Sequence, residues 1–402
     1  MKSPITRSLK FLLIMLVTLA LCACSLPTRK QAVPPELIAK AEVVNMPGVR
    51  YIVGTEITED HLREGLDSVK KERAYLATLA SSDTQKLPPV NFLALSGGGD
   101  DGAFGAGLLC GWTKSGLRPE FKLVTGISTG ALLAPFAFLG SKYDDALKQV
   151  FTEVTPIDIM QKRGPLAALF DDALADNEPL GQLVEKYVTP DMLKEIAAEY
   201  AKGRTLLMAT TNLDARQAVI WNMGKIAARD NAAALDLFHK IMLASSAIPG
   251  AFPPVMIDVE ANGQHFQEMH VDGGAISQAF IYPTTIKLSE VIKHQGLKRE
   301  RRLYLIRNAR LDPEREEVER LTLSIAGRAI SALIQAQGVG DLYKIFTIAQ
   351  RDDLDYNLAY IPKDFNALHK EEFDRAYMQQ LFQTGYELAI KGYDWKKVPP
   401  GM

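Results

Sequence analysis

The apolar residues of this chain follow two periodicities that alternate along the sequence. Short apolar runs predict buried β-strands at residues 90–95, 121–126, 205–211, 217–222, 269–274 and 302–307. Steps of three or four residues predict helices at residues 59–79, 103–112, 129–140, 235–246, 316–350 and 371–391. Strands that alternate with helices in this way indicate an α/β fold, in which helices cover both faces of a central, mainly parallel sheet.

Breaks in the pattern divide the chain into five parts. Residues 25–40 are rich in Pro, Thr, Lys and Gln, which is typical of a tether, and residues 81–89 carry a cluster of loop-forming residues. We therefore predict a signal peptide at 1–23, a tether at 24–40, an N-terminal helical extension at 41–87, a main α/β core at 88–310 and a helical C-terminal region packed on the core at 311–402.

The first residues have the pattern of an export signal. A positive segment with Lys2, Arg7 and Lys10 precedes an apolar stretch at residues 11–21, which is short for a permanent membrane span. Leu21-Cys22-Ala23-Cys24 then resembles the lipobox of bacterial lipoproteins. The resemblance implies that Cys24 receives the lipid. Because no aspartate follows it, the resemblance also implies a lipid-anchored protein of the bacterial cell envelope at the outer membrane.

Composition narrows the remaining possibilities. The 402 residues are 47% hydrophobic and 23% charged, which is ordinary for a globular protein. The net charge of −2 gives no reason to expect a nucleic-acid partner. After processing at Cys24 only Cys110 remains, so the mature chain has no internal disulfide, and we interpret Cys110 as a core residue.

The strongest chemical signal is Gly126-Ile127-Ser128-Thr129-Gly130, which lies between two apolar runs. That order predicts a strand, a sharp turn carrying one hydroxyl group, and a helix. Gly126 and Gly130 remove the side chains that would block such a turn, so we expect a nucleophile elbow with Ser128 at the positive end of a helix. A G-x-S-x-G string also arises by chance, so its surroundings decide what it means.

Two further motifs follow predicted strands and are expected at the same edge of the sheet. They are the glycine-rich turn at residues 96–102 and Asp272-Gly273-Gly274. Ligands of open α/β sheets bind beyond the carboxyl ends of the strands. Backbone N–H groups of a glycine run can bind an oxygen that becomes negative during acyl transfer. Ser128 can supply the attacking oxygen, and Asp272 can be the base that a hydroxyl nucleophile needs.

The order of these motifs resembles the patatin-like phospholipase family over residues 91–307. Residues 244–254, Ala-Ser-Ser-Ala-Ile-Pro-Gly-Ala-Phe-Pro-Pro, match a further segment of that family. The resemblance implies a three-layer α/β/α serine acyl hydrolase that acts on lipid esters through a Ser-Asp dyad, without metal or cofactor. By position it implies Ser128 as nucleophile, Asp272 as base, and Gly97, Gly98 and Gly99 as the lining of the oxyanion hole.

One residue departs from the family pattern. Asp101 stands where the family usually has Arg or Lys, just before the last glycine of the loop. We interpret Asp100 or Asp101 as the cap of the helix that starts near Ala103, with its charge directed at helix N–H groups. The oxyanion would then depend on backbone donors and the helix dipole.

Other interpretations of these motifs are weaker. Residues 97–102 also fit the dinucleotide pattern G-x-G-x-x-G, but the following strand ends in the serine elbow and not in an acidic residue. A Ser-His-Asp triad would need His294 or His369 as its third member, and both lie in polar stretches. His270 is interpreted as a structural histidine.

The sequence therefore predicts an exported, lipid-anchored serine acyl-ester hydrolase. Its expected partners are a lipid or phospholipid substrate and the membrane that holds its anchor. Two alternatives stay open: a non-catalytic envelope lipoprotein that binds acyl chains or a partner protein, and an α/β-hydrolase with a Ser-His-Asp triad.

Overall fold

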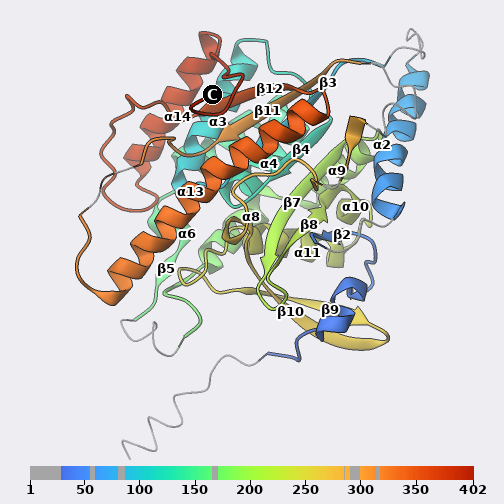
Figure 1. Cartoon of the computed structure of the whole chain (residues 1–402), viewed down its shortest axis with the longest axis horizontal. Coiled ribbons are helices and arrows are strands. Elements are labelled where there is room, and N and C mark those ends of the chain that lie inside the picture. The colour runs from blue at the N-terminus through green and yellow to red at the C-terminus, as the bar shows by residue number, and fades with distance from the viewer. Residues whose placement is uncertain are drawn as a thin grey trace, which may run out of the picture.

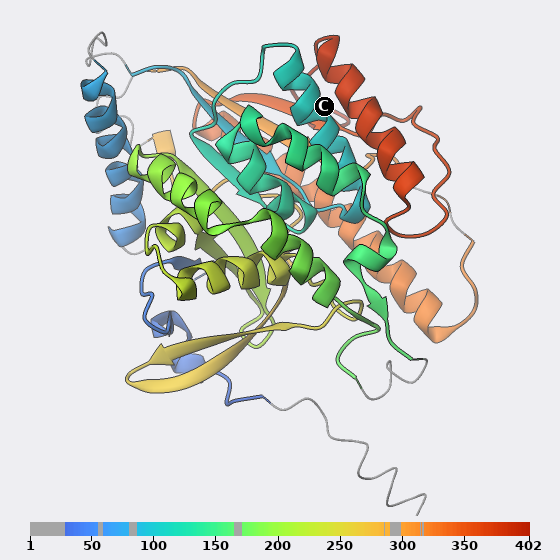
Figure 2. The same ribbon diagram turned by 180° about the vertical axis from the view of Figure 1, so that it is seen from behind.

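A computed structural model describes residues 29–54, 59–79, 87–164, 171–284, 286–289, 299–313, 315 and 317–402. The predicted signal peptide, Cys24 and His294 lie outside these residues. Figure 1 shows a central twisted sheet with helices in front of it and behind it, and Figure 2 gives the opposite view. The predicted three-layer α/β/α fold with a mainly parallel central sheet is confirmed.

Within the described residues, ten strands form the main sheet, in the order β1-β9-β10-β7-β4-β3-β11-β12, with β8 paired to β7 and β2 to β8. The five strands β7, β4, β3, β11 and β12 run parallel, and the pairs that involve β8, β9 and β10 are antiparallel. The strands are β1 (Glu42–Val43), β2 (Arg50–Ile52), β3 (Val90–Leu95), β4 (Leu123–Gly126), β7 (Thr205–Asn212), β8 (Gln217–Asn222), β9 (Val255–Ala261), β10 (Gln264–Asp272), β11 (Arg301–Arg307) and β12 (Asp355–Tyr360).

Helices cover both faces of this sheet. In Figure 1 the longest of them, α13, lies in front of the sheet, and Figure 2 shows several others on the opposite face. A small hairpin of β5 (Gln161–Lys162) and β6 (Ala175–Asp176) lies apart from the main sheet. The α-helices are α2 (Glu59–Thr78), α3 (Gly102–Lys114), α4 (Thr129–Leu139), α5 (Asp144–Thr152), α6 (Pro156–Ile159), α8 (Glu178–Tyr187), α9 (Pro190–Ala201), α10 (Met223–Ala227), α11 (Ala232–Ser245), α13 (Thr322–Arg351) and α14 (Arg375–Ile390).

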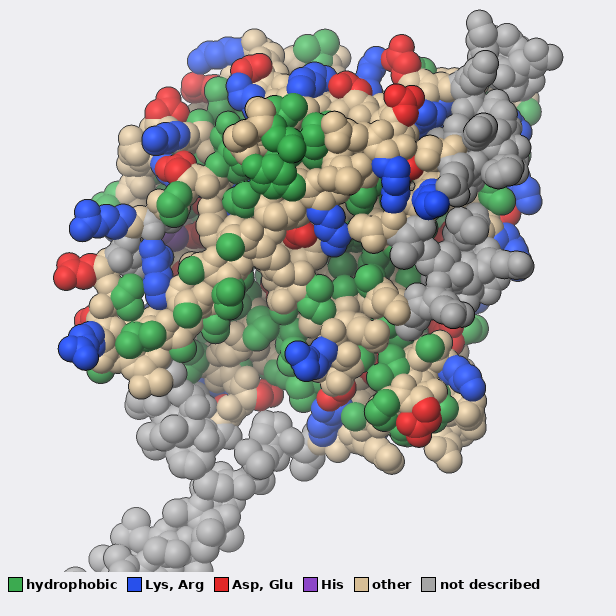
Figure 3. Space-filling view, in the orientation of Figure 1, with side chains coloured by type: hydrophobic (Ala, Val, Ile, Leu, Met, Phe, Trp, Pro, Cys, Tyr) green, Lys and Arg blue, Asp and Glu red, His purple; other side chains and the backbone are tan. Residues whose placement is uncertain are grey.

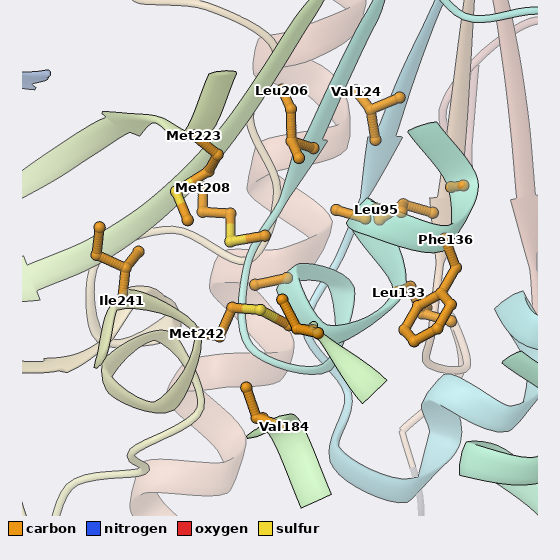
Figure 4. Packing of buried hydrophobic residues seen from close by; sticks show 14 of the residues in the cluster. Leu95, Val124, Leu133, Phe136, Val184, Leu206, Met208, Met223, Ile241 and Met242 are labelled. Atoms are coloured by element: carbon orange, nitrogen blue, oxygen red, sulfur yellow. The ribbon is translucent and has the colours of Figure 1, made fainter. Parts of the chain in front are cut away.

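The strand β3 shows why both faces must be covered. Its residues alternate between the two sides, so Leu93 and Leu95 join one core and Val90, Phe92 and Ala94 join the other. Burial of each large aliphatic side chain contributes about 1.5–3 kcal/mol. Figure 4 shows the first core, where the sheet residues Leu95, Val124, Leu206 and Met208 pack near Leu133 and Phe136 of α4, Val184 of α8, and Ile241 and Met242 of α11.

The N-terminal part of the chain departs from its prediction. Arg29 forms an ion pair with Asp214 at 2.8 Å and Lys30 one with Asp258 at 2.9 Å, so a free tether does not extend to residue 40. Residues 42–52 are not helical, because β1 and β2 extend the main sheet by pairing with β9 and β8. The helix α2 is present at Glu59–Thr78, close to the predicted bounds.

The C-terminal region is likewise not purely helical, as β12 forms the edge of the parallel sheet beside β11. The helix α14 packs closely against α3, the helix that follows the glycine-rich turn. A Cβ on Gly107 of α3 would lie 1.9 Å from the Phe382 carbonyl oxygen, so the two backbones can touch only at a glycine. Among the described residues, no helix is both long enough and apolar enough to cross a membrane.

Candidate active site

Ser128 lies in the sharp turn between β4 and α4, as the elbow prediction requires. Its φ of 55° and ψ of −127° place a non-glycine residue in a left-handed conformation that costs energy and persists only where the surroundings hold it. A Cβ on Gly126 would lie 2.3 Å from the Gly130 carbonyl oxygen, and one on Gly130 would lie 2.2 Å from the Leu95 carbonyl oxygen. Both glycines are therefore required by close backbone approach.

Asp272 ends β10 and is brought to the elbow by the antiparallel pairing of β10 with β7. Its carboxylate lies beside the Ser128 side chain and accepts a hydrogen bond of 2.6 Å from the Gly274 N–H. Asp272 is buried, and burial raises its pKa to about 7, although the nearby Ser128 side chain and the Gly274 N–H act to lower it. The hydroxyl and the carboxylate, 144 positions apart in the chain, are direct neighbours.

The segment at residues 244–254 connects these two positions. Ser245 is buried; its hydroxyl accepts a hydrogen bond from the Ser128 N–H at 3.0 Å and donates one to the Ala209 carbonyl at 2.7 Å. Two residues later, the Ala247 carbonyl accepts the Asp272 N–H at 2.9 Å. One short segment thus holds the backbones of both site residues. The family resemblance points to this segment in the sequence but indicates no role for Ser245.

The glycine-rich turn follows β3 at the same edge of the sheet. The Gly97 N–H is donated to the Gln278 carbonyl at 3.0 Å, which removes it from the predicted oxyanion hole. Gly98 and Gly99 have φ values of 158° and 58°, and within the described residues their N–H groups have no hydrogen-bond partner. The candidate oxyanion donors are therefore Gly98 and Gly99.

A buried asparagine that the sequence analysis missed fixes this turn. Asn308 donates its backbone N–H to the Ser96 hydroxyl at 2.8 Å and its side-chain amide to the Ser96 carbonyl at 2.9 Å. Its side-chain oxygen accepts the Gly105 N–H at 3.1 Å, and a Cβ on Gly98 would lie 1.8 Å from its carbonyl oxygen. No spacing in the sequence signals this residue, because Asn308 follows an ordinary apolar strand.

The two acidic residues of the turn do not cap a helix, contrary to the prediction. The helix α3 begins after Asp101 without a side-chain cap. Asp100 instead accepts hydrogen bonds from His369 at 2.7 Å and from the Phe373 N–H at 2.8 Å. Asp101 accepts one from the Tyr377 hydroxyl at 2.6 Å. Both carboxylates thus bind the glycine-rich turn to the C-terminal region.

A buried cation also lies near Asp101. Arg307, at the end of β11, has its pKa lowered to about 10 by burial, while the charges of Asp341 and Asp101 act to raise it. The guanidinium is therefore charged at neutral pH. The position that the family fills with Arg or Lys is acidic here, but a positive charge comes close to it from another strand.

A small apolar pocket opens beside Ser128. Ser128 and Gly99 border it, and part of its wall comes from α4, α5 and α8. Phe373 and Met378 of the C-terminal region lie on its lining. The pocket places apolar side chains next to a hydroxyl nucleophile; representative lining residues are Leu132, Val150, Phe151, Leu180, Ile248 and Phe252.

Two of the described histidines, His270 and His369, are bonded to groups other than Ser128 and Asp272. His270 is fully buried, and its two ring nitrogens bond to Thr210 at 2.8 Å and Glu268 at 3.0 Å. His369 bonds to Asp100. The Asp272 carboxylate lies beside Ser128 and accepts the Gly274 N–H, whereas His369 bonds to Asp100, so the geometry favours a direct Ser–Asp contact over a triad through His369.

Comparison with known proteins agrees with this geometry. Residues 93–284 match the family model of the patatin-like phospholipases. The chain therefore carries a patatin-like phospholipase domain, which contains both Ser128 and Asp272. Proteins described by that model are patatin-like phospholipases.

Two searches complete the comparison. Similar solved structures include the crystal structure of VipD from Legionella pneumophila, with a TM-score of 0.36 and 12% sequence identity. The match covers 75% of this chain and 66% of the VipD chain, so this chain spans slightly less than two thirds of that protein. A search of curated proteins finds no match.

Proposed function

We propose that this protein is a serine acyl-ester hydrolase in which Ser128 and Asp272 form a catalytic dyad. In the first half-reaction the Ser128 hydroxyl oxygen attacks the ester carbonyl while its proton passes to the Asp272 carboxylate. The carbonyl oxygen becomes negative and is held by the N–H groups of Gly98 and Gly99. Collapse of this intermediate breaks the ester bond, the leaving alcohol takes the proton from Asp272, and an acyl-serine remains.

The second half-reaction uses the same groups. Asp272 removes a proton from water, and the resulting hydroxide attacks the acyl-serine carbonyl. The second tetrahedral intermediate collapses with cleavage of its bond to the Ser128 oxygen. Asp272 returns its proton to that oxygen, and the fatty acid is released. Ser128 and Asp272 end the cycle in their starting protonation states. Every proton that Asp272 takes up is given back within the cycle.

The observation that carries this proposal is the position of the buried Asp272 carboxylate beside the Ser128 side chain, at the edge of an apolar pocket. A carboxylate beside a hydroxyl group has the position of a general base. The pocket gives the acyl chain of the substrate a place beside the attacking oxygen. A non-catalytic acyl-binding protein would need neither a strained serine nor a buried carboxylate beside it.

A fluorophosphonate probe tests the nucleophile directly. We expect the wild-type chain to be labelled and to hydrolyse a soluble short-chain ester, and Ser128→Ala to do neither. Asp272→Asn should lose about 10²–10⁴-fold in turnover, the usual contribution of a general base. The matched controls are Ser141→Ala and Asp191→Asn, which change exposed residues away from the elbow.

The outcomes separate the candidate functions. Labelling of Ser128→Ala at the wild-type rate would refute the proposed nucleophile. A wild-type chain that binds fatty acid tightly but is not labelled would favour the acyl-binding lipoprotein instead. Normal activity of Asp272→Asn would exclude Asp272 as the base.

We further propose that the substrates are membrane lipids of the phospholipid or lysophospholipid class. Support comes from the apolar lining of the pocket and from the family implied by residues 93–284. Incubation of purified protein with defined phospholipids, followed by analysis of the released fatty acids, tests this subtype. Hydrolysis confined to soluble short-chain esters would contradict it.

Attachment to the cell envelope through Cys24 is a separate proposal. It rests on the sequence pattern Leu21-Cys22-Ala23-Cys24, which lies outside the described residues. Metabolic labelling with an alkyne fatty acid should mark the wild-type chain and Cys22→Ser but not Cys24→Ser. Equal labelling of Cys24→Ser would show that this cysteine is not the lipidation site.

A further inference from the structure

The long helix α13 has two halves with different surroundings. Its C-terminal half is packed into the core that it shares with β3, β11 and β12 through Leu342, Ile345, Ile348 and Ala349. Its N-terminal half, residues 322–337, is largely exposed. In Figures 1 and 2 this half extends past the end of the sheet. We name residues 322–337 the α13 arm.

The arm is apolar on the sides that solvent reaches. Ile325, Ile330, Leu333 and Ile334 are exposed, and Leu333 keeps 70% of its surface uncovered. The stretch from residue 321 to 340 contains no Asp, Glu or Lys and a single Arg. Figure 3 shows hydrophobic side chains recurring along this half of α13. Exposed helices usually carry charged residues on the outer face, so this surface indicates a site that another apolar surface covers.

The base of the arm touches the candidate active site. Gln337 donates its side-chain amide to the Ile276 carbonyl, four residues beyond Asp272. Gln335 accepts a hydrogen bond from Arg307 at 2.9 Å. Gln278, whose carbonyl binds the Gly97 N–H, also approaches Gln337 at 3.5 Å. The arm therefore rises from the same edge of the sheet at which Ser128 lies.

Other exposed apolar side chains belong to segments that form the pocket. Ile157 of α6 keeps 80% of its surface exposed, and Ile159 of the same helix lines the pocket. Leu368 is also exposed and lies in the loop that leads to the pocket residue Phe373. Segments that face the acyl pocket with one residue thus present another apolar residue to solvent.

We propose that the α13 arm docks the protein on a lipid surface, with its exposed Ile and Leu side chains inserted at the boundary between headgroups and acyl chains. This inference rests on the proposed acyl-hydrolase function, because it gives the arm the task of placing the pocket at the bilayer. A lipid that leaves the bilayer beside the arm reaches the pocket without crossing water.

The features of the arm favour lipid over a second copy of this chain. An interfacial helix needs apolar side chains of this size, and acidic residues oppose contact with anionic lipid. The arm supplies the first and lacks the second, and its base contacts the segment that follows Asp272.

The test compares substitutions in two exposed regions, which lie at opposite edges of the sheet, in the full chain. The arm variant is the double substitution Ile330→Ser and Leu333→Ser. The matched control is Leu117→Ser: Leu117 is 68% exposed and lies between the end of α3 and the start of β4, away from the elbow. Each protein is assayed on a soluble short-chain ester and on long-chain phosphatidylcholine in vesicles.

We expect the arm variant to lose about tenfold in vesicle hydrolysis, in line with removal of two apolar side chains from the interface, and to keep wild-type turnover of the soluble ester. Leu117→Ser should match wild type in both assays. Equal vesicle hydrolysis by all three proteins would overturn the docking proposal. If the wild-type chain did not hydrolyse the soluble ester, the proposed acyl-hydrolase function would be wrong. Failure of the docking proposal and failure of the proposed function therefore give different results.

A fluorescent label reports insertion directly. An environment-sensitive dye is attached to Leu333→Cys, or to Leu117→Cys, in the full chain with Cys22→Ser and Cys24→Ser; the remaining Cys110 is buried. Addition of phosphatidylcholine vesicles should shift the emission of the arm label to the blue and leave the control label unchanged. Absence of the blue shift on addition of vesicles would refute lipid docking. A blue shift that appears without vesicles and increases with protein concentration would also refute it, and would identify a second copy of this chain as the occupant.

Discussion

At the scale of single residues, Asp272 meets two opposing demands. A carboxylate must be ionised to accept the Ser128 proton, yet burial favours its neutral form and raises its pKa to about 7. A general base is most effective when its pKa lies near the working pH, because it is then both largely ionised and basic enough to take the proton. Burial therefore moves the pKa of this carboxylate toward the working pH, and the Ser128 side chain and the Gly274 N–H limit the rise.

The pH dependence of the reaction follows from this pKa. Asp272 is active when it is ionised, so kcat/KM should fall as the pH drops through about 7. An ordinary aspartate would lose activity only near about pH 4. Initial rates on a soluble ester between about pH 5 and about pH 9 check this. A flat profile across that range would mean that no base with a raised pKa takes part.

Protein stability provides the control, and its sign is opposite to that of activity. The folded-state pKa of Asp272 lies above the value of an unfolded chain, so its contribution to stability is complete at low pH and is lost as the pH rises through about 7. Asp272→Asn should therefore be more stable than wild type at about pH 8.5, by about 1–4 kcal/mol, although it is inactive. Denaturant unfolding at two pH values measures this difference. A destabilised variant at alkaline pH would contradict the account of a desolvated carboxylate.

At the scale of elements, the segment at the C-terminal end of α11 positions both members of the proposed dyad. Ser245 holds the Ser128 backbone against β7, and Ala247 holds the Asp272 backbone. The strained φ of Ser128 persists because such contacts surround it. The elbow and the acid come from strands far apart in the sequence, and this single segment couples them.

Removal of the Ser245 hydroxyl should therefore affect the reaction more than the fold. We expect Ser245→Ala to lose about 1–2 kcal/mol of stability, the cost of leaving the buried Ser128 N–H without an acceptor. A shift of the nucleophile should lower the rate of fluorophosphonate labelling by about 10–100-fold. Labelling kinetics and thermal unfolding, with Ser141→Ala as the exposed control, separate the two effects. Wild-type labelling by Ser245→Ala would show that the elbow holds its shape without this contact.

The same scale shows what sequence patterns can and cannot reveal. The strands at 90–95 and 217–222 and the serine elbow carry local signals, either apolar runs or paired glycines, and were predicted within a residue or two. The partners of Asp100 and Asp101 lie about 270 positions away, so periodicity had no access to them, and a helix cap was predicted instead. The strand β12 was missed because its short run contains a polar Asn357, which the structure buries with its amide bonded to the Leu303 carbonyl.

At the scale of the whole molecule, the region beyond the patatin-like match is part of the core. The match ends at residue 284, but β11 and β12 complete the parallel sheet and α14 packs along α3. Phe373 and Met378 lie on the lining of the pocket beside Ser128. The C-terminal region thus packs against the helix that follows the glycine-rich turn and forms part of the pocket wall. The geometry of the site therefore depends on this region.

The close contact between α3 and α14 predicts that two Gly→Ala substitutions change the stability of the protein in opposite directions. At Gly107 an added methyl group would meet the Phe382 backbone at 1.9 Å, and because backbone cannot rotate away, α14 must shift. We expect Gly107→Ala to lose about 2 kcal/mol or more, with a fall in ester turnover as the pocket wall moves. Gly65 lies in α2 with nothing within 4 Å of the added methyl group, so Gly65→Ala should gain about 0.5–1 kcal/mol through helix propensity. Thermal unfolding of both variants distinguishes close packing from a general intolerance of alanine. If Gly107→Ala were as stable and active as wild type, backbone contact would not hold α14 against α3. The packing of α14 on α3 would then not position the pocket wall.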